Sequence, residues 1–188
     1  GFGNILWNNM GVFDAPEHYI LGSNIPDVYR NQYKHIIALY HGPMDRAALD
    51  TGYAITNPAI MPPLFDNHDI ALLGDIHKRQ DMQLYSPENN KPCIHYVGSM
   101  IQQNHGENLK NHGYSMWDLS TNTYEFHELP NNFGYFTVEV SKGQLTTDLT
   151  DLPKKVRLRI RCYESIASEI KTVVAHIKTL AQVVETAY

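Results

Sequence analysis

Three residues whose side chains could bind a metal ion follow short apolar stretches of this chain. His41 comes after residues 36–40, and Asp75 and His77 come after residues 69–74. Imidazole and carboxylate groups are the ligands that hydrolytic Mn, Zn or Fe centres use, and two such ions can hold the attacking and leaving oxygens of a phosphodiester. Asp75 and His77 are two positions apart, so both would point the same way on extended backbone. Alternatively, they are ordinary polar residues that end strands.

The stretches that precede these residues predict strands. Near-continuous apolar runs at 35–40, 69–73 and 94–97 are typical of strands buried on both faces of a sheet, and the third is followed by Gly98 and Ser99. In an open α/β sheet, ligands collect at the carboxyl ends of the strands. The three strand ends therefore predict one site.

The remainder of the chain predicts a hairpin and then a second, smaller domain. Residues 114–119 and 124–129 are separated by a polar turn, as in a β-hairpin. Breaker residues at 130–134 predict a boundary, which divides the chain into domains 1–131 and 132–188. After two further strands, at 135–140 and 155–162, apolar residues at helical spacing predict a helix that runs to the end of the chain.

Composition narrows the class of protein. The chain has 188 residues, 43% of them hydrophobic, with a net charge of −5 and two distant cysteines. That cysteine usage predicts a reduced, intracellular protein. No apolar run approaches the roughly 20 residues that span a bilayer, so we expect a soluble, cytoplasmic protein without a membrane partner. The missing initiator Met and the helical end suggest a piece of a longer or split protein.

A series of short motifs over residues 36–130 resembles a known enzyme family. The matching motifs are Ala38-Leu-Tyr-His41, Gly74-Asp-Ile-His77, Tyr96-Val-Gly-Ser-Met-Ile-Gln102, Gly106-Glu107 and the hairpin that follows. In this order they resemble the calcineurin-like metallophosphoesterases, and most closely the C-terminal half of the SbcD/Mre-type nuclease subunits that process DNA ends.

This resemblance implies a fold and a metal site. The fold would be α/β (α+β): part of a metallophosphoesterase β-sandwich flanked by helices, followed by the beginning of a small α/β capping domain that binds DNA. Two divalent ions, Mn²⁺ with Mg²⁺ or Zn²⁺ as alternatives, would hydrolyse DNA phosphodiesters. His41 and Asp75 would bind the second metal, and His77 the first. Asp75 replaces the first histidine of Gly-His-x-His, and is either a working ligand or a mark of an altered site.

The resemblance also implies partners. The family's three earlier motifs, which supply the bridging carboxylate and the histidine that protonates the leaving oxygen, do not occur ahead of His41. We therefore expect the chain alone to be inactive, with a missing N-terminal half through which the family forms homodimers. The other expected partners are DNA and an SbcC-type ATPase, in a nucleoid-associated enzyme of DNA repair and recombination. The Asn-rich composition suits a phage or virus.

Basic residues near these motifs are candidates for DNA contacts, with a solvated surface as the alternative. They are Lys78, Arg79, His105 and the alternating Arg157, Arg159 and Arg161. His112 is a further candidate for a phosphate contact. His68 is expected at the surface or a helix end, and His95 is expected to pack or to face solvent.

Two other functions fit the same residues. One is a calcineurin-like phosphodiesterase acting on small substrates, which the Gly-Ser-x-x-Gln segment and the added tail disfavour. The other is a non-catalytic scaffold or binding subunit that kept the fold and lost the metals, which Asp75 and the missing early motifs favour.

Overall fold

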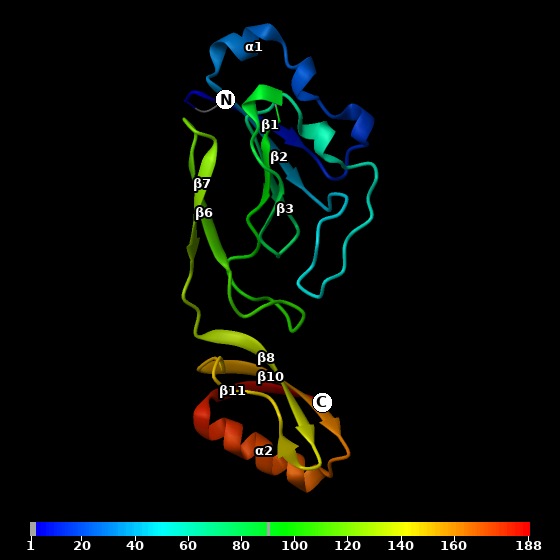
Figure 1. Cartoon of the computed structure of the whole chain (residues 1–188), viewed down its shortest axis with the longest axis vertical. Coiled ribbons are helices and arrows are strands. Elements are labelled where there is room, and N and C mark those ends of the chain that lie inside the picture. Colours follow the sequence, from blue (N-terminus) through cyan, green and yellow to red (C-terminus); the bar gives the residue numbers. More distant parts are fainter. Residues whose placement is uncertain (1–2, 90) are drawn as a thin grey trace. The chain divides into compact units, whose positions relative to one another are not determined.

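The computed structural model describes residues 3–89 and 91–188, and it combines several β-sheets with few helices, so the fold class is α+β (Figure 1). The chain divides into two compact units. The first contains the residues up to Met100 together with His112–Glu128, and the second contains Ile101–Asn111 and Leu129–Tyr188. The division expected between residues 131 and 132 lies just inside the last of these segments.

A five-stranded sheet organises the first unit. Its strands follow the order β1 (Ile5–Met10), β2 (His35–His41), β3 (Ile70–Gly74), β5 (Cys93–Tyr96) and β4 (Gln80–Gln83). All neighbouring strands are parallel except β4, which runs antiparallel to β5 at the edge. The predictions of strands at 35–40, 69–73 and 94–97 are confirmed, with ends shifted by one residue.

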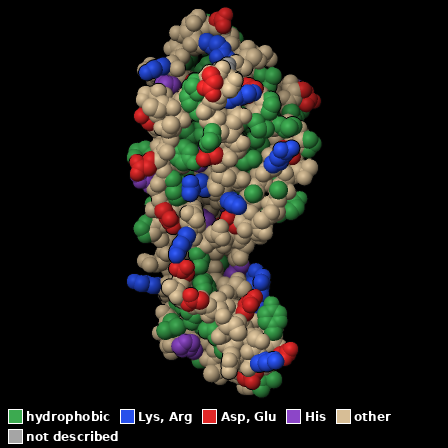
Figure 2. All heavy atoms as spheres, in the orientation of Figure 1, with side chains coloured by type: hydrophobic (Ala, Val, Ile, Leu, Met, Phe, Trp, Pro, Cys, Tyr) green, Lys and Arg blue, Asp and Glu red, His purple; other side chains and the backbone are tan. Residues whose placement is uncertain are grey.

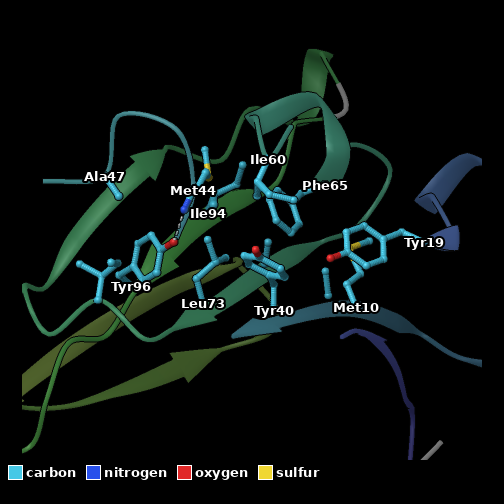
Figure 3. Close-up of a cluster of buried hydrophobic side chains, with 13 residues drawn as sticks. Met10, Tyr19, Tyr40, Met44, Ala47, Ile60, Phe65, Leu73, Ile94 and Tyr96 are labelled. Atoms are coloured by element: carbon cyan, nitrogen blue, oxygen red, sulfur yellow. Dashed lines mark hydrogen bonds between the residues drawn. The ribbon is translucent and has the colours of Figure 1, made fainter. Parts of the chain in front are cut away.

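One face of this sheet carries the main core of the unit. Because side chains alternate along a strand, Ala38 and Tyr40 of β2 share this face with Leu73 of β3 and Tyr96 of β5. Figure 3 shows Phe65, from the segment between β2 and β3, beside Tyr40, and Met44, from the same segment, beside Tyr96. The segments that join the strands therefore cover this face.

Helices in the first unit are short. They are α1 (Asp27–Gln32) and the 3-10 turns Pro16–His18, Gly22–Asn24, Pro62–Phe65 and Pro87–Asn89. Three of the 3-10 turns begin with proline, and Pro26 precedes α1, at positions where no backbone N–H is required. The sheet, and not the helices, therefore sets the geometry of this unit.

The predicted hairpin is confirmed as β6 (Gly113–Asp118) and β7 (Thr123–Glu128), drawn in yellow-green in Figure 1. Its strands alternate between exposed side chains, such as Tyr114 and Met116, and partly buried ones, such as Ser115 and Trp117. The partly buried set faces β4 and β5, because Ser115 is hydrogen-bonded to His95 of β5.

The second unit is a four-stranded sheet packed against one helix. The strands follow the order β11 (Gln182–Ala187), β10 (Lys155–Tyr163), β8 (Phe133–Ser141) and β9 (Gln144–Leu145). Helix α2 (Ala167–Leu180) places Val173, Val174 and Ile177 against the valines, leucine and isoleucine of β8 and β10. The strands predicted at 135–140 and 155–162 are confirmed.

The prediction of a helix to the end of the chain is wrong. Helix α2 ends at Leu180, Ala181 adopts extended backbone, and β11 then pairs in parallel with β10. The segment Gln182–Ala187 has β-branched Val183, Val184 and Thr186, which favour a strand. Ala181 and Val184 continue the spacing of the helix by coincidence, so periodicity alone did not find its end. Among the described residues, no helix is long and apolar enough to cross a membrane.

Candidate functional site

The carboxyl ends of β2, β3 and β5 lie side by side at one edge of the first sheet. The register pairs His41 with Gly74, and Leu73 with Tyr96. The loops after the three strands therefore begin at the same edge, which is the arrangement expected from the sequence. His41, Asp75 and His77 all belong to this edge.

His41 lies directly over Gly74. A Cβ atom at residue 74 would collide with Nδ1 of the His41 ring, so the close approach requires glycine. The His41 side chain is nonetheless exposed. The imidazole is thus held against the start of the loop that carries Asp75, and it remains accessible to a ligand from solvent.

Asp75 does not continue the extended backbone of β3. Its φ is +83°, in the left-handed region that L-residues other than glycine, Asn and Asp rarely adopt. The argument that Asp75 and His77 point the same way required extended backbone, so that argument fails. Ile76 between them is buried in the core and fixes the turn, while the side chain of Asp75 is exposed.

His77 is held through its backbone by the loop after β5. Ser99 N–H donates to the His77 carbonyl oxygen at 3.0 Å. Gly98, with φ of +81°, approaches so closely that a Cβ there would collide with that same oxygen and with the Arg79 nitrogen. The Gly98-Ser99 pair at the third strand end therefore positions the loop of His77.

Ser99 is itself fixed by a buried histidine. Ser99 Oγ and His112 Nδ1 are hydrogen-bonded at 2.9 Å, and both residues are buried. A phosphate contact by His112 would require exposure to solvent, so the buried position of this ring does not fit that expectation. His112 supports the strand-end loops instead.

A buried tyrosine holds the loop that follows His41. The Tyr96 hydroxyl donates to the Gly42 carbonyl oxygen at 2.7 Å and accepts from Met44 N–H at 2.9 Å, an interaction drawn in Figure 3. Burial raises the pKa of Tyr96, and the carboxylate of Asp75 adds to this effect. The pKa of Tyr40 is also raised, by burial first and by Asp75 to a smaller extent. Both phenols therefore stay neutral beside Asp75.

These ligands do not by themselves complete a metal site. Within residues 3–89 and 91–188, no three His, Cys, Asp or Glu side chains gather closely enough to hold a metal ion. Imidazole and carboxylate suit a divalent ion chemically. The roles of His41, Asp75 and His77 as metal ligands stay predictions.

The basic residues next to His77 have structural surroundings. Arg79 lies over the Phe126 ring, with its guanidinium carbon 4.0 Å from the ring centre, and both Lys78 and Arg79 are half-buried. Arg79 therefore contacts the hairpin β6–β7. To bind a DNA phosphate as well, its guanidinium would have to keep this contact.

The arginines of β10 alternate on one face of the second sheet, as expected, but glutamates lie beside them. Arg157 is 3.4 Å from Glu185 of β11, and Arg161 is 3.9 Å from Glu139 of β8. Three arginines and two glutamates leave a net charge of +1 for these five residues, Arg159 included. Acidic and basic side chains are likewise interspersed on the face of the molecule drawn in Figure 2.

His105 packs in the second unit, with its ring centre 5.1 Å from that of Tyr135 and Nδ1 3.4 Å from Thr137 Oγ1. Burial lowers the pKa of His105, and the positive charge of Arg159 lowers it further. The neutral ring makes His105 a weaker contact for a DNA phosphate than a protonated one would be.

The sequence reading missed a buried network around His95. His95 Nδ1 donates to the Asp81 carboxylate at 2.7 Å, and Nε2 lies 3.0 Å from Ser115 Oγ. The Tyr124 hydroxyl donates to the same carboxylate, and the Tyr124 ring centre is 4.2 Å from that of His95. Burial lowers the pKa of His95. A neutral ring can accept a hydrogen bond from Ser115 while donating to Asp81.

His68 is also buried, so the expected surface position is wrong, whereas the alternative, a helix end, agrees with its place just after the 3-10 turn Pro62–Phe65. Its Nδ1 is 2.9 Å from the Phe65 carbonyl oxygen, and its Nε2 is 2.9 Å from Asn8 Nδ2. The residue follows a 3-10 turn, and a ring with two hydrogen-bond partners can be buried there at little cost. Its role is to join β1 to that turn.

Comparison with known proteins gives one relative of unassigned role. No family model matches the chain. A protein of Acanthamoeba polyphaga mimivirus, named Uncharacterized protein R555, is 36% identical over an alignment of 162 residues that covers 84% of this chain. The chain spans only 11% of the length of that protein.

Proposed function

We propose that this chain is a C-terminal portion of an SbcD/Mre-like, metal-dependent nuclease that hydrolyses phosphodiesters at DNA ends. The observation that carries the proposal is the shared edge of β2 and β3, where His41 lies over Gly74 and precedes the Asp75–His77 turn. Histidine and aspartate at adjacent strand ends are suited to hold divalent ions, and the ordered motifs around them resemble that family.

On the face of the first sheet opposite the core, the hairpin β6–β7 covers β5 at His95, and partly exposed apolar side chains of β1, β2 and β3 support a further layer, as in a metallophosphoesterase sandwich. Parallel strands occur almost always in sheets covered on both faces. On the face opposite the core, Trp7 of β1 is 41% exposed, and Leu39 and Leu72 are partly exposed although they are paired neighbours. A further layer of chain, such as the expected N-terminal half, would cover these apolar side chains.

Two divalent ions, Mn²⁺ in the first instance, would be bound with residues from that half. On this proposal the chain alone is inactive. The intact enzyme would dimerise through the missing half, work with an SbcC-type ATPase on DNA in the cytoplasm, and serve repair or recombination. The similarity to a mimivirus protein supports a viral origin.

Metal binding by the chain joined to its N-terminal half tests the proposal. We expect titration calorimetry to detect Mn²⁺ binding by this joined protein, weaker in His41→Ala and Asp75→Ala and unchanged in the matched control His176→Ala, which alters an exposed histidine of α2. Joined to its N-terminal half, the protein should cleave linear DNA when Mn²⁺ is present. Metal binding that is identical in all four proteins would contradict the assignment.

The second candidate is a non-catalytic scaffold subunit. The observation that favours it is that the described residues contain no group of three metal ligands, together with aspartate at position 75 in place of histidine. If no Mn²⁺ binds to the chain joined to its N-terminal half, this candidate replaces the nuclease. If metal binds but only small phosphodiesters are cleaved, the protein is a phosphodiesterase of the same fold.

A further inference from the structure

The hairpin β6–β7 borders two adjoining hollows in the first unit, each of about 310 Å³. Thr123 and Tyr124 line both. The first hollow is completed by Met116, Trp117, Asp118 and Glu125, and the second by Leu84, Tyr85, Cys93 and Asn122. Each volume is at the lower end of the range typical of ligand pockets, enough for one large side chain.

Large apolar side chains at these hollows are open to solvent. Leu84 is 73% exposed and Met116 is 57% exposed, and Tyr85 is partly exposed beside Leu84. Leu84 and Tyr85 directly follow β4, the edge strand of the first sheet. Neighbouring exposed apolar side chains around a hollow are typical of a surface that binds a partner.

The segments that form the hollows carry negative charge, although Arg79 contacts the hairpin at Phe126. The hairpin segment 113–128 contains Asp118, Glu125 and Glu128 and no Lys or Arg, and segment 84–89 adds Glu88 and again no basic residue. Hydrogen bonds from Ser120 lower the pKa of Asp118, and a hydrogen bond from Ser86 lowers the pKa of Glu88. These carboxylates therefore stay ionised at neutral pH.

A buried acceptor lies in the wall of the second hollow. The side-chain oxygen of Asn122 is buried and has no hydrogen-bond partner within the part of the chain that the structure describes. Such unsatisfied groups are few in folded proteins. A donor from a bound partner, reached by a small rotation of the side chain, would satisfy it.

We propose that this hairpin surface binds a peptide segment of another protein in which large apolar or aromatic side chains alternate with Lys or Arg. The apolar side chains would fill the two hollows, and the basic ones would meet Asp118 and Glu125, since complementary charges set specificity in such contacts. A nucleic acid backbone would be repelled by the same carboxylates. The surface is separate from the strand-end site, because Cys93 begins β5 whereas His41 and Gly74 end β2 and β3.

Fluorescence anisotropy with a labelled peptide tests this proposal. The probe alternates tryptophan and leucine with lysine. Matched probes replace every lysine by glutamate, or every tryptophan and leucine by serine, and labelled single-stranded DNA is a fourth probe. We expect saturable binding of the first probe to the whole chain, and binding at least about tenfold weaker for the two matched peptides.

Variants locate the contact. The double variant Asp118→Lys with Glu125→Lys should bind the lysine peptide about tenfold more weakly at low salt, and Met116→Ser should bind it about threefold more weakly. The matched control, Asp151→Lys with Glu164→Lys, reverses two exposed carboxylates of the second unit and should bind normally. Circular dichroism confirms that each variant is folded.

Three results would overturn the proposal. They are no saturable binding of the lysine peptide by the folded chain, an equal loss in the control variant, and saturable binding of the labelled single-stranded DNA that the double variant Asp118→Lys with Glu125→Lys leaves unchanged. Because the assay contains no metal and measures no cleavage, its failure leaves the proposed nuclease function unaffected.

Discussion

Two clusters of histidine and aspartate in the first unit use the same residue types in opposite ways. At the strand-end edge, the side chains of His41 and Asp75 are exposed to solvent. Beneath the hairpin, His95 is 1% exposed, and its two ring nitrogens are hydrogen-bonded to Asp81 and Ser115. The first cluster can still accept a ligand, whereas the hydrogen-bonding capacity of the second is already used by the fold.

This difference shows that residue types alone do not decide whether such a cluster is catalytic or structural. A Ser, His and Asp linked by hydrogen bonds could be taken for a nucleophile and its base. Here the ring lies between the sheet and the hairpin, against Trp117 and Tyr124, and Ser115 does not line either of the two hollows beside the hairpin. We therefore interpret the His95 network as one that stabilises the fold, and the strand-end edge stays the proposed ligand site.

Of the changes that test this contrast, removal of the His95 ring should have the largest effect on stability. In His95→Ala, Asp81 and Ser115 each lose the hydrogen bond to the ring, and a cavity opens between the sheet and the hairpin. We expect the free energy of unfolding to fall by about 3 kcal/mol in urea denaturation.

The matched change at the exposed cluster is His41→Ala. Because this side chain is exposed, the loss should be about 0.5 kcal/mol or less. Equal losses in the two variants would remove the distinction between a structural and a ligand-binding histidine.

Gly98→Ala tests whether the backbone of the strand-end edge is as constrained as the buried network. At φ of +81° an alanine is strained, and its Cβ would meet the His77 carbonyl oxygen and the Arg79 nitrogen, both backbone atoms. We expect a loss of about 2 kcal/mol in the same urea assay. Gly52→Ala is the control, since its φ of +87° is similar and no atom lies within 4 Å of the added Cβ. A loss no greater than that of the control would mean that Gly98 does not position the His77 loop.

Mild acid should weaken the buried network. Burial lowers the pKa of His95, and Arg79 contributes in the same direction, although Asp81 opposes both. Below about pH 6.5, the unfolded chain therefore binds more protons than the folded chain. The free energy of unfolding then falls as the pH falls from about 6.5 toward the lowered pKa that His95 has in the folded chain.

We expect the free energy of unfolding to be about 1 kcal/mol lower at about pH 5.5 than at pH 7.5. His68, whose pKa is also lowered by burial, contributes to this change. In His95→Gln the difference between the two pH values should shrink. An unchanged difference would show that the His95 network does not titrate in this range.

The sequence predicted those parts of the fold that are encoded locally. Apolar runs identified β2, β3 and β5, a polar turn between two strand-like runs identified the hairpin, and alternation identified β10, because burial repeats with the period of the strand. It could not place Asp81 opposite His95, since that contact depends on β4 returning antiparallel to β5 with a shift in register. It also missed the end of α2, where Val184 fits helical and strand periods equally.

At the strand-end site, the sequence predicted which residues share an edge and not how their side chains are directed. The positions of His41, Asp75 and Gly98 follow from strands that stop together. The left-handed backbone at Asp75 is set by the burial of Ile76 in the core, a tertiary effect. The arginines of β10 alternate as expected, but their glutamate neighbours come from β8 and β11, which are distant in sequence.

The smallest expected effect concerns the strain at Asp75. An aspartate at φ of +83° costs about 1 kcal/mol relative to unstrained backbone, and glycine at this position would relieve that strain while losing about 0.5 kcal/mol to the greater entropy of the unfolded chain. Asp75→Gly should therefore raise the free energy of unfolding by about 0.5 kcal/mol, whereas Asp75→Asn should leave it nearly unchanged. Both variants remove the carboxylate, so both, joined to the N-terminal half, should bind Mn²⁺ more weakly in titration calorimetry. If Asp75→Gly gains stability and loses metal binding, the exposed cluster retains backbone strain that the buried network avoids. If Asp75→Gly is less stable than the natural chain, the carboxylate of Asp75 stabilises the fold.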